Sequence, residues 1–411
     1  MPIVKLSVFG KSEQNRVPTT ENPASIVSAG ESGNIEVKIT GKNLINVSEE
    51  AISISYDVGS YTIKNGVIAF NTVNNWGGDY LYFNDIDVSR NKELVFQMEA
   101  TLPEKQDTET NGAKILVKAY NELGEEIKDS ESAISSDTWK MTYNNYYKGL
   151  VYYRRGSNIP IKFSNMVAKI KIGVCFLDNI AGKPVIIKNY QAEYGTASTA
   201  YEPYKEQTIT LQTPTGLLGL KVNSGGNYTD SNGQQWICDE IDLARGKYVQ
   251  RIEKYACTGN ENIIKSFEDE SIIEYMFHAE EISNNALYES NGFSTHYEYL
   301  NARKGGTCTI GAGKYAYIRY NVADNVTPAQ IKEFYRRQKE AETPVAFYYI
   351  LDKPAETDLP PETLATFKKL HTNYPNTIVS NNADAGMELT YTVDTQSYID
   401  GKIATLSKAL L

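Results

Sequence analysis

Two stretches of the sequence combine aromatic rings with polar side chains in a way that suits sugar binding. The first is the turn-prone segment 74–80, which carries Trp76, Asp79 and Tyr80. Pyranose rings stack on aromatic planes, while their hydroxyl groups need hydrogen-bond partners such as carboxylates and amides. We therefore predict that Trp76, Asp79 and Tyr80 bind carbohydrate.

The second stretch, 139–155, is rich in aromatic and basic residues. We predict that Trp139, Tyr147 and Arg154 form a second sugar-binding platform there. The alternative for Trp76 and Trp139 is packing in the core or at its rim, because a tryptophan in a β-sandwich usually buries most of its ring. Both interpretations remain open at this point.

The charged residues show no pattern that specifies catalysis. Asp79, Asp85 and Asp87 lie close together in the sequence, but their spacing fits no EF-hand loop, so solvated turn carboxylates are the favoured interpretation and no metal site is predicted. The three histidines form no HExxH pattern, and no GxSxG or P-loop motif is present. We expect neither enzymatic activity nor a cofactor.

The cysteines are widely spaced and form no CxxC pair, so neither a zinc site nor a dense disulfide framework is indicated. We expect them to be mostly reduced, buried thiols. They are Cys175, Cys238, Cys257 and Cys308.

Length and charge limit the class of protein. A chain of 411 residues exceeds the usual size of a single core, so two or three domains are expected. Its net charge of -10 argues against a surface that binds nucleic acid. The N-terminus lacks the apolar run of a signal peptide and no segment has the length and apolarity of a membrane span, which predicts synthesis in the cytoplasm.

The elements that would position these residues are mostly strands. Residues 1–34 begin with a strand-like alternation and then become polar, which predicts an N-terminal arm or attachment segment. In 35–204 short β-favouring runs recur between turns without a long amphipathic helix. This pattern predicts an antiparallel β-sandwich of the jelly-roll type.

The second half predicts another β-rich module over 205–358. Its one clear helix begins at Thr327 and Pro328 and carries Ile331, Phe334 and Tyr335 on one face. Residues 359–411 predict a short helix around 364–370, a strand near 387–393 and a C-terminal oligomerisation helix. The fold class is therefore mainly β, with tandem sandwich modules, an N-terminal arm and a short C-terminal coiled coil.

The C-terminal helix is predicted from the heptad spacing of Ile399, Ile403, Leu406 and Leu410. Isoleucine at both kinds of seam position favours trimers, so a homotrimer is expected. The alternative is a terminal amphipathic helix that docks on its own domain.

Several phrases, in their order, resemble modular tail, baseplate and minor structural proteins of phages and prophages of Gram-positive bacteria. They include FGKSEQ with VPTTENPASIVSAGESGNIEVKITGKNL, then IIKNYQAEYGTASTAYEPYKEQTITL, then GGNYTDSNGQQWICDEIDLARGKYVQRIEK, and finally MELTYTVDTQSYIDGKI. The resemblance implies that the sandwich over 35–204 is a carbohydrate-binding-like jelly roll. It also implies a virion protein of the distal tail or baseplate that assembles with other tail proteins.

Two functions are compatible with this resemblance. In the first, the sandwiches recognise the host surface by binding cell-surface glycan, and trimerisation multiplies a weak single-site affinity. In the second, the chain is a purely architectural tail connector without glycan binding. A third interpretation, an accessory module of a secreted glycan hydrolase, is disfavoured because no signal peptide and no catalytic domain are recognisable.

Overall fold

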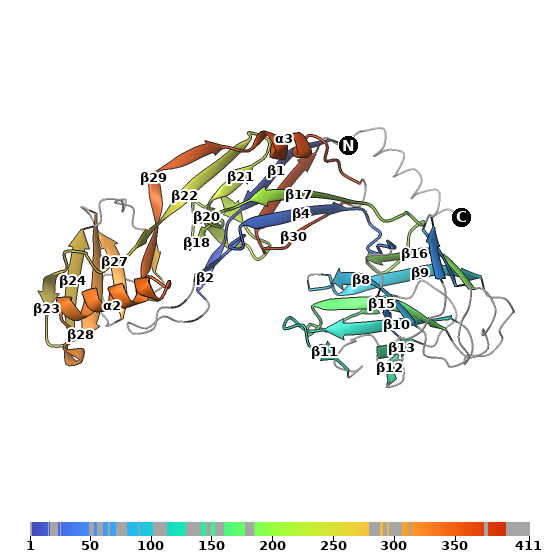
Figure 1. Ribbon diagram of the computed structural model, residues 1–411, viewed down its shortest axis with the longest axis horizontal. Coiled ribbons are helices and arrows are strands. Elements are labelled where there is room, and N and C mark those ends of the chain that lie inside the picture. Colours follow the sequence, from blue (N-terminus) through green and yellow to red (C-terminus); the bar gives the residue numbers. More distant parts are fainter. Residues whose placement is uncertain are drawn as a thin grey trace. The chain divides into compact units, whose positions relative to one another are not determined.

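The computed structural model describes most of the chain (Figure 1). The described residues are 2–14, 16, 24, 26–48, 53–55, 61–64, 66–70, 80–89, 91–101, 113–128, 141–144, 149–152, 160–176, 185–278, 288–290, 294–295, 306–311, 314–373 and 377–391.

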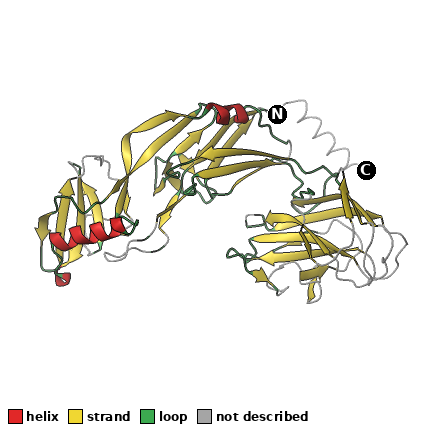
Figure 2. Ribbon diagram, in the orientation of Figure 1, coloured by secondary structure: helices red, strands yellow, loops and turns green. Residues whose placement is uncertain are grey.

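The protein is mainly β and consists of several antiparallel sheets, as the sequence predicts. The α-helices of the described part of the chain are α2 (Pro328–Glu340) and α3 (Pro361–Phe367), which are drawn red in Figure 2. Neither these nor any other described helix is both long and apolar enough to cross a bilayer.

The chain divides into two compact units. Unit 1 contains Met1–Lys38, Thr208–His371 and Ser380–Leu411, and unit 2 contains Ile39–Gln207 and Thr372–Val379. Most of unit 2 is therefore one long insertion into the sequence of unit 1. Its main segment spans nearly the same residues as the sandwich predicted over 35–204.

Unit 2 has two antiparallel sheets. One has the strand order β12 (Met141–Asn144), β13 (Gly149–Tyr152), β10 (Ala113–Tyr120), β15 (Lys169–Phe176), β8 (Tyr80–Asp87) and β5 (Ser53–Ser55), with β11 (Glu126–Ile127) paired to β10. The other has the order β14 (Ile161–Lys162), β9 (Glu93–Thr101), β16 (Val185–Tyr194), β7 (Val67–Phe70) and β6 (Tyr61–Lys64).

The two sheets share one hydrophobic core, as in a β-sandwich. Phe83 and Ile172 enter it from the first sheet, and Phe96 and Ile187 from the second. A bulge in β16 shifts the alternation of that strand, so that Tyr190 also faces the core.

The bulge in β16 is made by Asn189, whose φ of 54° lies in the left-handed region that asparagine tolerates better than most residues. Its side chain donates to Glu99 on β9 at 2.7 Å, which fixes the bulge. Beyond it the buried Tyr190 donates to the carbonyl of Gly66 at 2.8 Å, so this polar atom is satisfied.

The largest sheet of unit 1 joins strands from distant parts of the sequence. Its order is β25 (Tyr288–Ser290), β29 (Ala346–Asp358), β22 (Lys247–Ala256), β21 (Glu240–Asp242), β1 (Ile3–Phe9) and β31 (Gly386–Tyr391). The segment predicted as an arm thus contributes β1, which lies between β21 and β31. Both edges of β1 are paired with strands of the same sheet, and its side chains Leu6 and Val8 are fully buried.

Three smaller sheets complete the framework. They are β18 (Gly219–Val222), β20 (Gln235–Cys238) and β19 (Tyr228–Thr229); β2 (Ser12–Gln14) and β3 (Ile26–Ser28); and β17 (Glu206–Gln212), β4 (Asn34–Thr40) and β30 (Ile378–Asn381). The backbones of Gly10 and Gly219 approach closely: a Cβ atom at Gly219 would lie 2.2 Å from the carbonyl oxygen of Gly10. Only glycine fits at this contact.

The α2 subdomain, which we define as the described residues of 257–345, is inserted between β22 and β29. Its sheet has the order β23 (Ile264–Glu268), β24 (Ile272–His278), β28 (Tyr315–Asn321), β27 (Thr307–Gly311) and β26 (Ser294–Thr295). The amide of Cys257 donates to the carbonyl of Val345 at 2.8 Å and closes the insertion at its base.

Helix α2 begins where the sequence predicts. Thr327 and Gln330 form a capping box, and Pro328 occupies the first turn. The helix lies across one face of the sheet of the α2 subdomain (Figure 1), where Ile331 and Tyr335 pack in the core. Phe277 of β24 meets Tyr335 edge-to-face at 6.4 Å.

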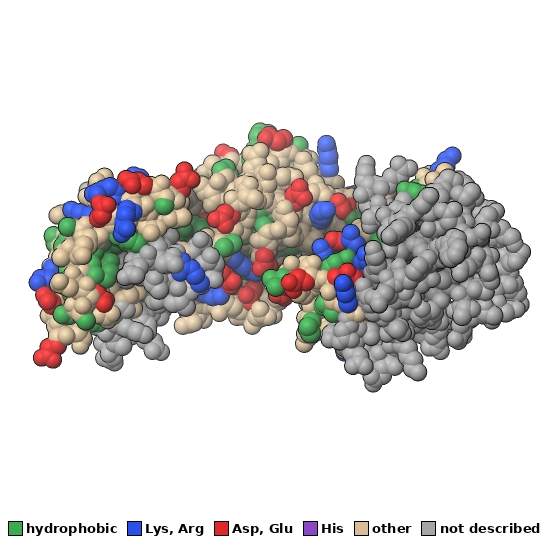
Figure 3. Space-filling view, turned by 60° about the horizontal axis from the view of Figure 1, so that its bottom comes forward, with side chains coloured by type: hydrophobic (Ala, Val, Ile, Leu, Met, Phe, Trp, Pro, Cys, Tyr) green, Lys and Arg blue, Asp and Glu red, His purple; other side chains and the backbone are tan. Residues whose placement is uncertain are grey.

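Charged side chains of both signs lie interspersed over the described part of the face in Figure 3. Exposed ion pairs of the described residues include Lys221 with Glu13 at 2.9 Å and Lys265 with Glu268 at 2.7 Å. Such pairs contribute at most about 1 kcal/mol each, so the fold depends on its cores and not on these contacts.

Candidate functional site

Most of the predicted site residues lie outside the described residues. This holds for Trp76, Asp79, Trp139, Tyr147 and Arg154, and also for the predicted seam residues Ile399, Ile403, Leu406 and Leu410. Tyr80 is the first residue of β8. The described strands nevertheless show where the chain enters and leaves both stretches that are predicted to bind sugar.

Strand register places three of the strand ends that border these stretches at one end of the large sheet of unit 2. They are Tyr80, Met141 and Tyr152. Tyr80 pairs with Cys175 on β15, and Cys175 pairs with Lys114 on β10. One residue further along β10, Ile115 pairs with Tyr152, the last residue of β13. Tyr152 in turn pairs with Met141, the first residue of β12.

The two predicted stretches therefore adjoin the same sheet end. Asp79 directly precedes Tyr80, Trp139 lies two residues before Met141, and Arg154 lies two residues after Tyr152. Tyr147 belongs to the segment that links Asn144 of β12 to Gly149 of β13, at the opposite ends of these strands. The register thus separates the strand ends next to Tyr147 from those next to the other predicted residues.

Asp85 and Asp87, which lie close to Asp79 in the sequence, have protein partners. Asp85 pairs with Lys169 at 2.9 Å and with Lys171 at 3.5 Å. Asp87 accepts from the amide and the hydroxyl of Ser89 at 2.7 and 2.6 Å, which is a turn-capping arrangement. Among the described residues, no three His, Cys, Asp or Glu side chains are placed to hold a metal ion.

A buried polar cluster joins the two ends of the main segment of unit 2. We call this region, residues 42–45 and 190–202, the base of unit 2. The side chain of Asn43, which is 1 % exposed, donates to the carbonyls of Tyr190 and Glu202 at 3.1 and 2.9 Å. Its oxygen accepts from the amides of Ile45 and Ala192. This one side chain therefore ties the start of unit 2 to the end of its main segment.

Lys42 adds a charge to the same base. Its ammonium group is 6 % exposed and lies 3.2 Å from the carboxylate of Glu202. It also donates to Thr199 at 2.5 Å, and Thr199 donates to Glu193 at 2.8 Å. A buried charge is tolerated only with such partners, so the two ends of the segment are held together by a satisfied network.

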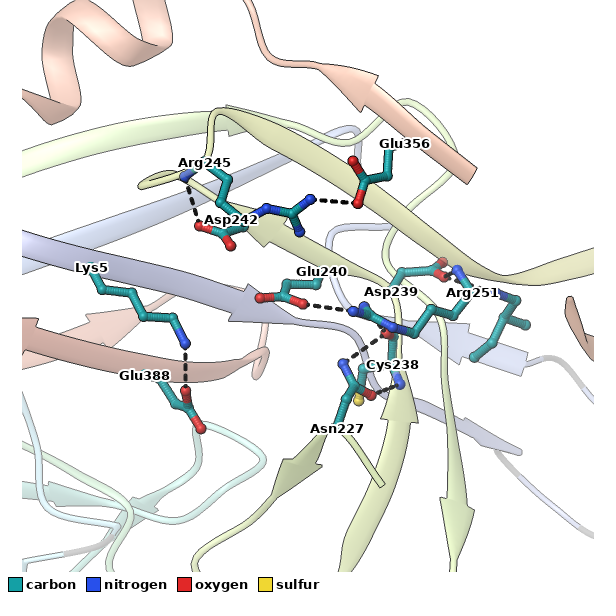
Figure 4. Close-up of polar contacts among 11 residues, drawn as sticks. Lys5, Asn227, Cys238, Asp239, Glu240, Asp242, Arg245, Arg251, Glu356 and Glu388 are labelled. Carbon is teal, nitrogen blue, oxygen red and sulfur yellow. Dashed lines mark hydrogen bonds and ion pairs between the residues drawn. The ribbon is translucent and has the colours of Figure 1, made fainter. Parts of the chain in front are cut away.

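Unit 1 has a second buried polar cluster, centred on Asp239 between β20 and β21 (Figure 4). The carboxylate is 1 % exposed and accepts from the amides of Arg251 and Ile252 at 2.7 and 3.0 Å. Arg251 lies at a register shift between Gln250 and Ile252, where the pairing of β22 with β29 is interrupted. Asp239 thus accepts amide hydrogens at the irregularity in this ladder.

The side chain of Arg251 completes the cluster. It pairs with Glu240 at 3.0 Å and donates to the carbonyl of Cys238 at 3.0 Å. Asn227 accepts from the amide of Cys238 at 2.7 Å and donates to its carbonyl at 3.2 Å, as Figure 4 shows. These contacts fasten β20 to β22.

Burial raises the pKa of Asp239 to about 6, against the opposing effect of the amide hydrogen bonds. A carboxyl group with this pKa could serve as a general acid or base. With 1 % exposure, however, it meets no substrate unless the sheet opens. The cluster therefore has a structural role.

Beside this cluster, the exposed residues Arg245 and Glu356 and the buried Asp242 form a second set of polar contacts. The amide of Arg245 donates to Asp242 at 3.0 Å, and its guanidinium group pairs with Glu356 at 2.6 Å. The hydrogen bond and charge of Arg245 lower the pKa of Glu356. No signal in the sequence distinguishes these charges from ordinary surface residues.

The described cysteine side chains, those of Cys238, Cys257 and Cys308, are buried free thiols, which confirms the expectation for these three. Burial raises the pKa of Cys238 to about 12 and raises the pKa values of Cys257 and Cys308 as well. Because the thiolate is the nucleophile, these groups are chemically inert in the folded protein.

Comparison with family models, with curated proteins and with solved structures found no match to this chain.

Proposed function

We propose that this chain is a structural protein of the tail or baseplate of a phage or a phage-derived particle, and that it takes part in recognition of the host surface. In this proposal unit 2 is a jelly-roll module that binds cell-surface glycan. The protein acts by binding and not by catalysis, and it works in the virion after synthesis in the host cytoplasm.

The main observation in support of this proposal is the strand register of the large sheet of unit 2. It places the strand ends next to Asp79, Trp139 and Arg154 at one end of the sheet. Loops at one end of a rigid β-scaffold are a common location for binding residues, because the scaffold fixes where each loop starts and ends.

The closed base of unit 2 supports a modular role. Asn43 and Lys42 bind residues 190–202 at the far end of the same segment. A module whose ends meet can be carried by another unit without disturbing the strands of its carrier.

We further propose that the chain forms a homotrimer through Ile399, Ile403, Leu406 and Leu410 and contacts other tail or baseplate proteins. Three copies would present three sugar sites to one surface, which raises the effective affinity by effective concentration. This part rests on the heptad spacing alone.

The test is binding of the full chain to cell-wall preparations from a panel of Gram-positive bacteria. We expect at least one wall to retain the protein, and Trp76→Ala and Trp139→Ala to weaken retention about tenfold, since each removes a stacking surface. Lys64→Ala, an exposed change on β6, is the matched control and is expected to bind normally.

Two outcomes would contradict glycan recognition by unit 2. Either no wall retains the wild-type protein, or both tryptophan variants bind as the wild type does. If the chain then co-purifies with a tail protein, the architectural connector is the correct interpretation.

A further inference from the structure

The α2 subdomain has a second sheet face that its own core does not use. Ala316, Ile318 and Tyr320 of β28 point into the core beneath α2. Because successive side chains of a strand alternate between faces, Tyr315, Tyr317 and Arg319 lie on the opposite face. The same reasoning places alternate residues of β24 there. We call this surface the aromatic face; it consists of Glu274, Met276, His278, Tyr315, Tyr317 and Arg319.

The rings of the aromatic face are neighbours. His278 pairs with Tyr315 across the ladder, with ring centroids 5.1 Å apart and an interplanar angle of 67°. Tyr315 and Tyr317 follow one another on the same side of β28 at 6.3 Å and 49°. His278 is exposed and both tyrosines are half-buried. The rings therefore form one continuous row that solvent reaches.

Two small residues of β27 are the register partners of the tyrosines in this row. On β27, Gly311 is the register partner of Tyr315 and Thr309 is the partner of Tyr317. Glycine brings no side chain to the flank of Tyr315, while Thr309 brings a hydroxyl group that can donate and accept. A flat ring beside hydroxyl and imidazole groups suits a pyranose, whose apolar face stacks while its hydroxyl groups are hydrogen-bonded.

The charges at the end of the row cancel. Arg319, which is 2 % exposed, forms an ion pair with Glu274, and Ser266 donates to the same carboxylate at 2.7 Å. A neutral pair gives an ionic ligand no net attraction, so an uncharged ligand is favoured over a phosphate or a uronic acid.

We propose that the aromatic face binds the neutral pyranose rings of a glycan, with Tyr315 and Tyr317 as the stacking surface and with His278 and Thr309 as hydrogen-bond partners. This is a sugar site in unit 1, separate from the one proposed for unit 2. That its natural ligand comes from a host surface rests on the proposed function; sugar binding itself does not.

The test is saturation-transfer NMR on the full chain with the methyl pyranosides of glucose, galactose, N-acetylglucosamine and rhamnose as probes. We expect transfer to the ring protons of at least one sugar. Tyr315→Ala and Tyr317→Ala should each weaken its binding about tenfold, whereas Tyr317→Phe, which keeps the ring, should bind nearly as the wild type does.

Tyr201→Ala in unit 2, where the tyrosine is 36 % exposed, is the matched control and should leave binding unchanged. Circular dichroism melting of each variant shows whether it is folded, and only folded variants are compared. The proposal is overturned if no probe receives saturation, or if both alanine variants bind as the wild type does.

The experiment distinguishes the sugar site proposed here from the one proposed for unit 2. If Trp76→Ala abolishes transfer and the variants of Tyr315 and Tyr317 do not, the sugar is bound by unit 2 and the present inference is wrong. If the variants of Tyr315 and Tyr317 abolish transfer but no cell wall retains the protein, the inference holds and the proposed function fails.

Discussion

The carboxylate of Asp239 and the amide of Ile252 are joined by a hydrogen bond of 3.0 Å that is buried between two sheets of unit 1. The amide of Arg251, one residue earlier, donates to the same oxygen at 2.7 Å. A single side chain thereby compensates the irregular register of β22. Its removal would leave buried amides without a protein acceptor.

Replacement of Asp239 should therefore destabilise unit 1. We expect Asp239→Asn, which keeps the shape but places an NH2 donor against the amide of Leu218, where Asp239 accepts at 3.2 Å, to lower the free energy of unfolding by about 2–4 kcal/mol. Urea titration followed by circular dichroism measures this. Asp358→Asn, which alters a side chain that is 84 % exposed, should change it by less than about 1 kcal/mol. Equal effects of the two changes would argue against a structural role for Asp239.

The titration of Asp239 should make the stability of the folded state depend on pH. The pKa of Asp239 is about 6 in the folded protein and about 4 in an unfolded chain. The folded state therefore binds more protons between these values, and its stability rises as pH falls from about 6 to about 4. A difference of about two units corresponds to about 3 kcal/mol.

The measurement is the unfolding free energy of the wild type minus that of Asp239→Asn, taken at several pH values between neutral and acidic. Because the variant lacks this titration, contributions from other carboxyl groups cancel. We expect the difference to grow as the pH is lowered through 6. A constant difference would show that the carboxyl group titrates normally.

Asn43 should determine whether the base of unit 2 stays closed. Asn43→Leu removes four hydrogen bonds from a site that is 1 % exposed, and we expect it to destabilise unit 2 by about 3 kcal/mol. Amide hydrogen exchange in residues 190–202 should accelerate in this variant. Asn165→Ala, at an exposed turn of the same unit, should leave exchange there unchanged.

The trimer is tested at the C-terminal seam. If the chain is a trimer, Ile403→Asp should dissociate it, because each subunit would place a charge in the buried seam. Light scattering measures the mass directly. Lys408→Asp, off the seam, should leave the mass unchanged. A wild-type protein that scatters as a stable monomer would contradict the proposed trimer.

Local signals in the sequence predicted local structure well. Helix α2 begins at the predicted cap because Thr327, Pro328 and Gln330 act within one turn. The strand character of most segments also follows from alternation and turn residues. In contrast, β1 pairs with β31, whose residues lie almost at the other end of the sequence, and alternation alone cannot identify such a partner.

The candidate sites also differ in whether local sequence signals could predict them. The aromatic face depends on the register that aligns His278 with Tyr315, and the Asp239 cluster depends on an irregularity in the register of β22. Both arise from non-local pairing that composition does not encode. The stretches around Trp76 and Trp139 were visible in the sequence because all their aromatic and polar residues are close neighbours there.

The position of β1 has a consequence for synthesis on the ribosome. This strand is made long before β31, yet one of its edges pairs only with β31. The α2 subdomain, by contrast, is contiguous in sequence and can fold earlier. The nascent chain must therefore keep an unpaired β1 edge until β31 has been made. During that interval the edge is open to pairing with a neighbouring nascent chain.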